Sequence, residues 1–270
     1  MKMFFYVHEK FLCQYSKEKQ KHSFFCERTN RKQSIITNFK SENFKNKENE
    51  LTKEKKNYNQ VKSKKRVADH GEVFTNEREV NAMLDLVKHE TERIESRFLE
   101  PACGNGNFLA EVLRRKLNVV EQRYSKSQFD WERYAVIAVS SIYGVEILED
   151  NAQECRERLY SIFNERYTAL FNAHCKDECR RSIRFLLNRN ILWGDALDFT
   201  NPETKEPIVF SEWSAVNSTM MKRRDYMFKF LVEKTHQLSL FNDEGNAAAI
   251  DEPVKDYPLI HFLKLSESQI

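Results

Sequence analysis

The chain lacks several features that would assign it to a special class of protein. No run of 18 apolar residues occurs in its 270 residues, so we expect no membrane-spanning helix. The apolar start MKMFFYV is too short for a secretory signal peptide, and no small-residue cleavage site follows it. The six cysteines are irregularly spaced, which excludes a disulfide framework and is typical of reduced thiols. We therefore expect a cytoplasmic protein.

Charge is unevenly distributed along the chain. Residues 1–66 hold 18 Lys/Arg and 7 Asp/Glu, whereas residues 67–270 hold 26 and 34. A basic arm on a mildly acidic body indicates a polyanionic partner such as nucleic acid, although a solvated tail has the same composition. Few apolar residues anchor the arm, so we expect residues 1–66 to form a loose helix or remain disordered.

From residue 67 onward, short apolar segments alternate with helical patterns. Apolar segments at 97–102, 141–148, 190–199 and 206–213 predict strands. Apolar residues at helical spacing predict helices at about 76–94, 107–117, 128–141, 151–167, 177–187 and 222–233. Thr75 or Asn76 is suited to cap the first of these helices. This alternation predicts the α/β class, with a mainly parallel sheet flanked by helices.

The segment FLEPACGNGNFLAEVL places two glycines between the first strand and a helix. Gly104 and Gly106 remove side chains where the backbone has to bend sharply and where a ligand could approach it. In doubly wound sheets, ligands bind at the carboxyl ends of the strands. A plain turn would also explain a single Gly-x-Gly, so this motif needs support from elsewhere in the chain.

Acidic residues end the next two predicted strands. Glu146 closes YGVE and is placed to accept hydrogen bonds from both hydroxyls of a ribose. Asp195 follows the third strand in WGDAL and could accept from an exocyclic amine such as adenine N6. Either residue alone could be an ordinary surface or turn acid. Together with the glycine turn, in this order, they predict a nucleotide-like ligand.

These motifs carry a family resemblance. GEVFT, FLEPACGNGNFL, YGVEI and GDAL resemble the cofactor-binding half of the DNA adenine N6-methyltransferases of bacterial restriction–modification systems. The resemblance covers about residues 66–235. It implies a Rossmann-like methyltransferase fold, S-adenosylmethionine as the cofactor, adenine-containing DNA as a partner, and a second restriction–modification subunit as another.

The resemblance also implies roles for individual residues. Those expected to bind the cofactor are Phe74, Thr75, Glu100, Pro101, Ala102, Gly104, Gly106, Glu146, Ile147, Asp195, Ala196 and Leu197. Phe74 and Thr75 would lie near its methionine end, and residues 100–106 would form the wall and turn beneath it. Ile147 would pack on the adenine, and Ala196 and Leu197 would close the pocket. Asn76 and Asn105 stand where the family usually has Pro and Ser.

The family's catalytic motif, Asn/Asp-Pro-Pro-Tyr/Phe, occurs nowhere in the chain. That motif supplies acceptors for the protons of the adenine amine and a ring that stacks on the flipped base. The corresponding place is PIVFSEW, where Ser211 lies 16 residues after Asp195. Ser211, Glu212 and Trp213 could provide an acceptor and a ring, but a structural role at a strand end is the favoured interpretation. The catalytic residues therefore remain unknown.

Other groups of residues give weaker signals. Lys222, Arg223 and Arg224 could grip phosphates or could begin a solvated helix. His174, Cys175 and Cys179 lack a second ligand pair at zinc spacing, so we expect no metal site. Cys103 has no paired histidine, which disfavours covalent catalysis. Trp131, Trp193 and Trp213 are expected in the core rather than in base stacking.

We expect three regions: a basic arm over 1–66, a cofactor-binding domain over 67–240, and a tail over 241–270. The first functional hypothesis is a DNA adenine methyltransferase with an unconventional or partner-supplied catalytic element. The second is a non-catalytic subunit or remnant that binds S-adenosylmethionine and needs another chain for activity. A methyltransferase for RNA or protein on the same fold is a third, which GEVFT and LEPACGNGNFL disfavour.

Overall fold

The computed structural model describes residues 62–70, 72–232 and 252–268. The chain divides into two compact units between Val73 and Phe74. Before the division, helix α2 spans Lys64–His70, and the Arg66 guanidinium forms two hydrogen bonds with the Glu72 carboxylate. Most of the predicted basic arm lies outside the described residues, so its state stays a prediction.

A three-stranded parallel sheet carries the predicted motifs. Its strands are β1 (Phe98–Glu100), β2 (Ile142–Glu146) and β3 (Ile191–Trp193), in the spatial order β1-β2-β3. Glu100 pairs with Gly144, and Glu146 pairs with Trp193. Because all three strands run the same way, their carboxyl ends meet at one edge. The predicted α/β class with a parallel sheet is confirmed.

Helices precede and connect these strands. They are α3 (Glu77–Asp85), α4 (Lys88–Thr91), α5 (Asn107–Tyr124), α6 (Gln128–Ser140), α7 (Glu149–Phe171) and α8 (Asp177–Asn190), with a short 3₁₀ turn η2 (Asn172–His174) before α8. Each of these α-helices overlaps a stretch predicted to be helical, and Asn76 caps α3 by accepting from the Arg78 N–H. Among the helices of the described residues, none has the length and apolar character needed to cross a membrane.

Helix boundaries differ most from the prediction at α3 and α5. The single helix predicted over 76–94 is divided after Asp85, because Val87 leaves the helical region with φ −122°. Leu84, before this break, and Val87, at the break, are both buried. Helix α5 continues to Tyr124, seven residues beyond its predicted end at 117. Its added turns bury Val119 and Val120, which the shorter prediction left out.

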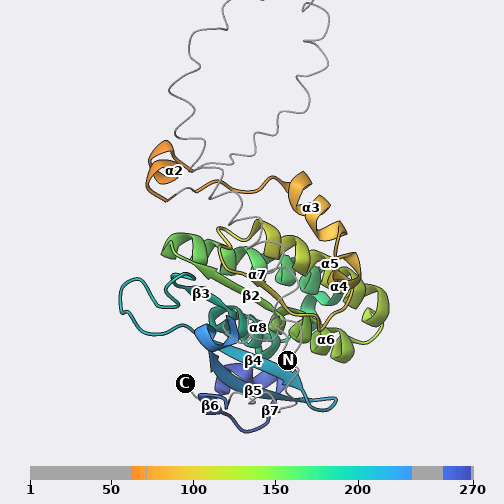
Figure 1. Cartoon of the computed structure of the whole chain (residues 1–270). Coiled ribbons are helices and arrows are strands. Elements are labelled where there is room, and N and C mark those ends of the chain that lie inside the picture. The colour runs from red at the N-terminus through yellow and green to blue at the C-terminus, as the bar shows by residue number, and fades with distance from the viewer. Residues whose placement is uncertain (1–61, 71, 233–251, 269–270) are drawn as a thin grey trace, which may run out of the picture. The chain divides into compact units, whose positions relative to one another are not determined.

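The two faces of the parallel sheet are covered by different partners (Figure 1). On one face, Gly144 leaves space that the Cys103 thiol and the Leu109 side chain of α5 fill. On the other face, Tyr143 and Val145 join a core cluster with Phe210. Side chains alternate along β2, so Glu146 lies on the same face as Gly144, toward the helices.

The strand predicted at 206–213 forms, but outside the parallel sheet. It is β4 (Val209–Ala215), which pairs antiparallel with β5 (Met220–Met227). The short strands β6 (Lys255–Asp256) and β7 (Ile260–His261) add to β5, and the 3₁₀ helix η3 (Phe262–Glu267) follows. The described part of the predicted tail therefore contributes two short strands to this second sheet. Figure 1 shows it in blue.

The helix predicted near 222–233 is wrong over most of its length. Residues 220–227 form β5, and only 228–232 of the described part are helical. Burial alternates along β5, which places Met221, Arg223 and Asp225 inward. Arg223 and Asp225 form a buried ion pair, with Nη2 and Oδ2 2.7 Å apart. Two charged residues at inward positions hide the period-two pattern that would have indicated a strand.

Candidate functional site

The glycine turn between β1 and α5 requires both of its glycines. Gly104 has φ +53° and Gly106 has φ +84°, the left-handed region that residues with a Cβ avoid. A Cβ on Gly106 would lie 2.6 Å from the sulfur of Cys155, which is on α7. A Cβ on Gly104 would lie 3.2 Å from the ring of Phe74. The turn is therefore in close contact with Phe74 and with Cys155.

Glu146 connects the end of β2 to this turn. Its carboxylate accepts from the Gly104 N–H at 2.7 Å and from the Leu148 N–H at 3.1 Å. The side chain is 6% exposed, and in the described part of the chain it forms no ion pair. A carboxylate has about four acceptor positions, so two remain after these bonds. The predicted ribose acceptor thus lies beside the predicted turn.

The Phe74–Thr75 segment lies against the turn. The Phe74 ring packs beside Gly104. The Asn107 amide nitrogen donates to the Thr75 carbonyl at 3.0 Å. This brings a segment from before α3 to the start of α5, about 30 residues later in the chain.

Glu100 is buried at the end of β1 on the same face of the sheet. Burial raises the pKa of its carboxyl from 4.5 to about 7, a backbone hydrogen bond from Ala102 opposes the rise, and the nearby Glu146 charge adds to it. Pro101 is partly exposed and Ala102 is exposed at the rim. Of these three predicted residues, only Glu100 brings a titratable group into the site.

Asp195 begins a turn directly after β3. Its Oδ1 accepts from the Leu197 N–H at 2.8 Å and from the Asp198 N–H at 3.4 Å. Ala196 is partly buried, whereas Leu197 is 67% exposed. One carboxylate oxygen thus fixes the turn, and the other has acceptor capacity left.

Ile147 follows Glu146 and is 46% exposed. The indole N–H of Trp193 donates to the Ile147 carbonyl at 3.0 Å. Trp193 is only partly buried, whereas Trp131 and Trp213 are core residues as predicted. The ends of β2 and β3 are therefore tied together beside an apolar surface.

The predicted cofactor residues fall along one edge of the parallel sheet. Phe74, Thr75, Glu100, Gly104, Gly106 and Glu146 meet at the ends of β1 and β2. Ile147, Asp195, Ala196 and Leu197 lie at the ends of β2 and β3. The two groups adjoin because the Gly194 N–H donates to the Glu146 carbonyl at 2.9 Å.

Sequence reasoning assigned no role to two asparagines at the turn. Asn107 holds the Phe74–Thr75 segment, as described above. The Asn105 side chain donates to Glu154 at 3.1 Å, while its own carbonyl oxygen is buried without a partner among the described residues. The position of Asn107, a polar residue directly after Gly106 and before the apolar run Phe108–Ala110, is the signal that could have identified it.

Cys103 lies within the turn but is poorly suited to act as a nucleophile. A hydrogen bond with the Cys155 thiol raises its pKa well above the usual value, and burial raises the pKa further. Only the thiolate is strongly nucleophilic, so this environment keeps the sulfur protonated. Cys103 instead packs over Gly144, where a Cβ would lie 2.9 Å from its sulfur.

The FSEW segment is committed to structural contacts. The Ser211 hydroxyl donates to Asp225 at 2.7 Å, and Glu212 forms an ion pair with Arg97 at 2.7 Å. The Trp213 indole donates to the Asn190 side chain at 3.1 Å, inside the core. These contacts support the structural interpretation of the segment over a catalytic one.

The basic residues of KRRDYM are also engaged. Lys222 and Arg224 both pair with Asp256 of β6, at 2.5 and 3.7 Å. Arg223 is buried in its pair with Asp225, below the ring of Tyr257. The three basic residues that could have bound phosphates therefore lie on a strand, and each forms an ion pair with an aspartate.

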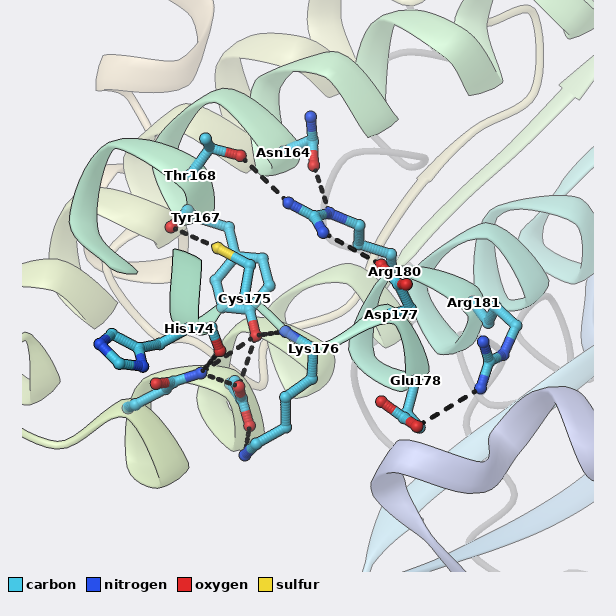
Figure 2. A network of polar contacts seen from close by, with 12 residues as sticks. Asn164, Tyr167, Thr168, His174, Cys175, Lys176, Asp177, Glu178, Arg180 and Arg181 are labelled. Atoms are coloured by element: carbon cyan, nitrogen blue, oxygen red, sulfur yellow. Dashed lines mark hydrogen bonds and ion pairs between the residues drawn. The ribbon is translucent and has the colours of Figure 1, made fainter. Parts of the chain in front are cut away.

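The HCKDEC stretch forms the connection from α7 to α8 (Figure 2). The Cys175 thiol donates to the Tyr167 carbonyl at 3.3 Å, and the Lys176 ammonium pairs with Glu132 at 2.7 Å. In Figure 2 the His174 ring lies apart from the Cys175 sulfur. Within residues 62–70, 72–232 and 252–268, no group of three or more His, Cys, Asp or Glu side chains is placed to hold a metal ion.

Comparison of the chain with known protein families, with curated proteins and with solved structures found no significant match. The motifs and the geometry of the site are accordingly the basis for assigning a function.

Proposed function

We propose that this chain binds S-adenosylmethionine at the carboxyl edge of its parallel sheet, as the cofactor-binding part of a DNA adenine methyltransferase of a cytoplasmic restriction–modification system. One observation carries the proposal: the buried Glu146 carboxylate lies beside a left-handed glycine turn, at the end of the strand next to β1. A carboxylate in that place is what a ribose with two free hydroxyls requires.

The residues at the edge fit such a ligand. Glu146 keeps two acceptor positions after its bonds to Gly104 and Leu148, one for each ribose hydroxyl. Ile147 and Leu197 are exposed apolar side chains that an adenine ring would cover. The second oxygen of Asp195 would accept from the adenine amine. When bound, S-adenosylmethionine supplies an electrophilic methyl group.

We extend the proposal to the fold. Parallel strands in the order β1-β2-β3, joined by helical connections, support a fold in which this sheet is one half of a Rossmann-like sheet. In such a sheet the ligand binds at the carboxyl ends of the strands, where Glu146 and Asp195 stand. The antiparallel β4–β5 pair packs on the face of this half and does not extend it.

A second function is favoured by one specific observation. The chain lacks the Pro-Pro-aromatic motif. In the segment that stands in its place, the side chains of Ser211 and Trp213 are hydrogen-bonded to buried residues of the core. A subunit that binds S-adenosylmethionine without catalysing transfer, and that needs a partner chain, would have this arrangement.

A methyl-transfer assay distinguishes the two functions. The full chain is incubated with S-adenosyl[methyl-³H]methionine and duplex DNA that contains every adenine-centred pentamer, alone and with the product of a neighbouring gene. Transfer by the chain alone supports the catalytic proposal, whereas transfer only with the partner supports the subunit. Saturable cofactor binding without transfer in either case would rule out the catalytic proposal for these substrates.

A further inference from the structure

Asn107, the first residue of α5, joins three separate parts of the chain. Its side-chain nitrogen donates to the Thr75 carbonyl at 3.0 Å. Its side-chain oxygen accepts from the Arg158 guanidinium of α7. One amide therefore connects the segment before α3, the glycine turn and the long helix α7.

The chemistry of the two partners fixes the orientation of this amide. An arginine can only donate and a carbonyl can only accept, so the Asn107 oxygen has to face Arg158 and its nitrogen has to face Thr75. Neither an aspartate nor a hydrophobic residue of the same size can satisfy both partners. The two partners therefore require an asparagine here, whereas the first position of a helix alone would accept other residues.

The bond to Thr75 acts on the segment that covers the turn. Phe74 precedes Thr75, and its ring lies so close to Gly104 that a Cβ there would approach it to 3.2 Å. Thr75 itself is exposed. Holding the Thr75 carbonyl is thus a way to keep the Phe74 ring over the turn.

We propose that Asn107 is a positioning residue that holds the Phe74–Thr75 segment over the glycine turn and so slows the release of a ligand bound there. The part about the ligand rests on the proposed function, whereas the part about the segment does not. The substitution Asn107→Asp separates the two bonds, because it keeps the acceptor for Arg158 and replaces the donor to Thr75 with a second acceptor.

This substitution should not weaken the fold as a whole. A carboxylate at the first position of a helix interacts favourably with the helix dipole. Asn107→Asp should therefore retain the wild-type melting temperature while the segment opens locally. If Asn107 only stabilised the fold, the substitution would lower the melting temperature and would not open this segment selectively. Asn107→Ala, which removes both bonds without adding charge, provides a second variant should the first fold poorly.

Asn118→Asp is the matched control. Asn118 lies on the same helix, and its side chain also accepts from an arginine of α7, Arg166, at 2.6 Å. It is exposed and lies about three helical turns beyond Asn107 on α5. The control therefore makes the same chemical change in a similar pair without acting on the turn.

Chymotrypsin provides a readout that needs no ligand, because Phe74 is itself a cleavage site. The rate of cleavage after Phe74, identified by mass spectrometry, follows how often the segment opens. Losing the hydrogen bond to Thr75 should raise that rate about five- to tenfold in Asn107→Asp and Asn107→Ala, and the rate should be unchanged in Asn118→Asp. Equal rates in all four proteins would overturn the inference.

Binding of S-adenosylmethionine provides the second readout. We expect its dissociation rate to rise by about the same factor in Asn107→Asp, with little change in the association rate. Faster cleavage with an unchanged dissociation rate would overturn the link to ligand release. A wild-type chain that binds no S-adenosylmethionine would overturn the proposed function and the ligand part with it, and the cleavage rates would decide the rest.

Discussion

The Glu146 carboxylate accepts a hydrogen bond from the backbone N–H of Gly104 at 2.7 Å, across 42 positions of sequence. A second backbone N–H, from Leu148, bonds to the other oxygen. The end of β2 and the turn after β1 are thereby held by one buried side chain. Glu146 is expected to contribute both to the fold and to the ligand.

The substitution Glu146→Gln tests the structural contribution. A carboxamide can present its oxygen to only one of the two N–H groups, so the other is left facing an NH₂ group. We expect the free energy of unfolding to fall by about 1–3 kcal/mol, measured by urea denaturation. Glu149→Gln, an exposed acid at the start of α7, is the control. A loss no larger than that of the control would contradict the assigned contacts.

Gly106→Ala tests the packing under the turn. Its new Cβ would lie 2.6 Å from the Cys155 sulfur and would adopt a φ of +84°. We expect the variant to lose more than about 2 kcal/mol, since backbone strain and a steric clash add. Adding Cys155→Ala to this variant should restore the part of the lost stability that is due to the clash. A double variant no more stable than Gly106→Ala would show that Cys155 does not cause the loss.

Glu100 should make stability depend on pH. Its pKa rises from 4.5 to about 7 on folding, so between these values the folded state holds a proton that the unfolded state has lost. This contribution is therefore fully present below about pH 4.5 and is lost as the pH rises to 7, by about 3 kcal/mol in total. In Glu100→Gln, the part of this pH-dependent fall in the free energy of unfolding that comes from Glu100 should vanish. Parallel pH profiles of the variant and the wild type would contradict the assignment.

Lys116 should act in the next pH range with the opposite sign. Its ammonium group is fully buried, and burial lowers its pKa from 10.5 to about 7. Between about pH 7 and 9 the unfolded chain binds this proton and the folded chain does not, so stability should rise by up to about 1.4 kcal/mol per pH unit. Lys116→Met should remove that slope in denaturation curves taken at several pH values. An unchanged slope would mean that the buried amine keeps its ordinary pKa.

The parallel half of the fold could be predicted from the sequence because its signals are local. Short apolar segments and helical spacing place β1, β2 and β3 and the helices between them. The acids at strand ends, Glu146 and Asp195, could be predicted for the same reason, since parallel strands bring their carboxyl ends together. The glycine turn was recognisable because Gly104 and Gly106 flank a single residue.

The features that could not be predicted from the sequence depend on contacts between residues far apart in the chain. Strand β5 escaped prediction because its inward positions carry Arg223 and Asp225, which are tolerable there only as a pair. The burial of Lys116 depends on acceptors such as the Ile94 carbonyl, 3.0 Å away. The role of Asn107 depends on Thr75 and Arg158, neither of which its local sequence indicates.

The central claim is that Glu146 and the glycine turn form a binding site for S-adenosylmethionine. Isothermal titration calorimetry on the full chain measures this directly, with melting temperatures recorded to confirm that each variant is folded. The account predicts saturable binding of one S-adenosylmethionine per wild-type chain, at least about tenfold weaker binding in Glu146→Ala, and unchanged binding in Glu149→Ala. Absence of binding by the wild type, or equal affinity in Glu146→Ala, would contradict it.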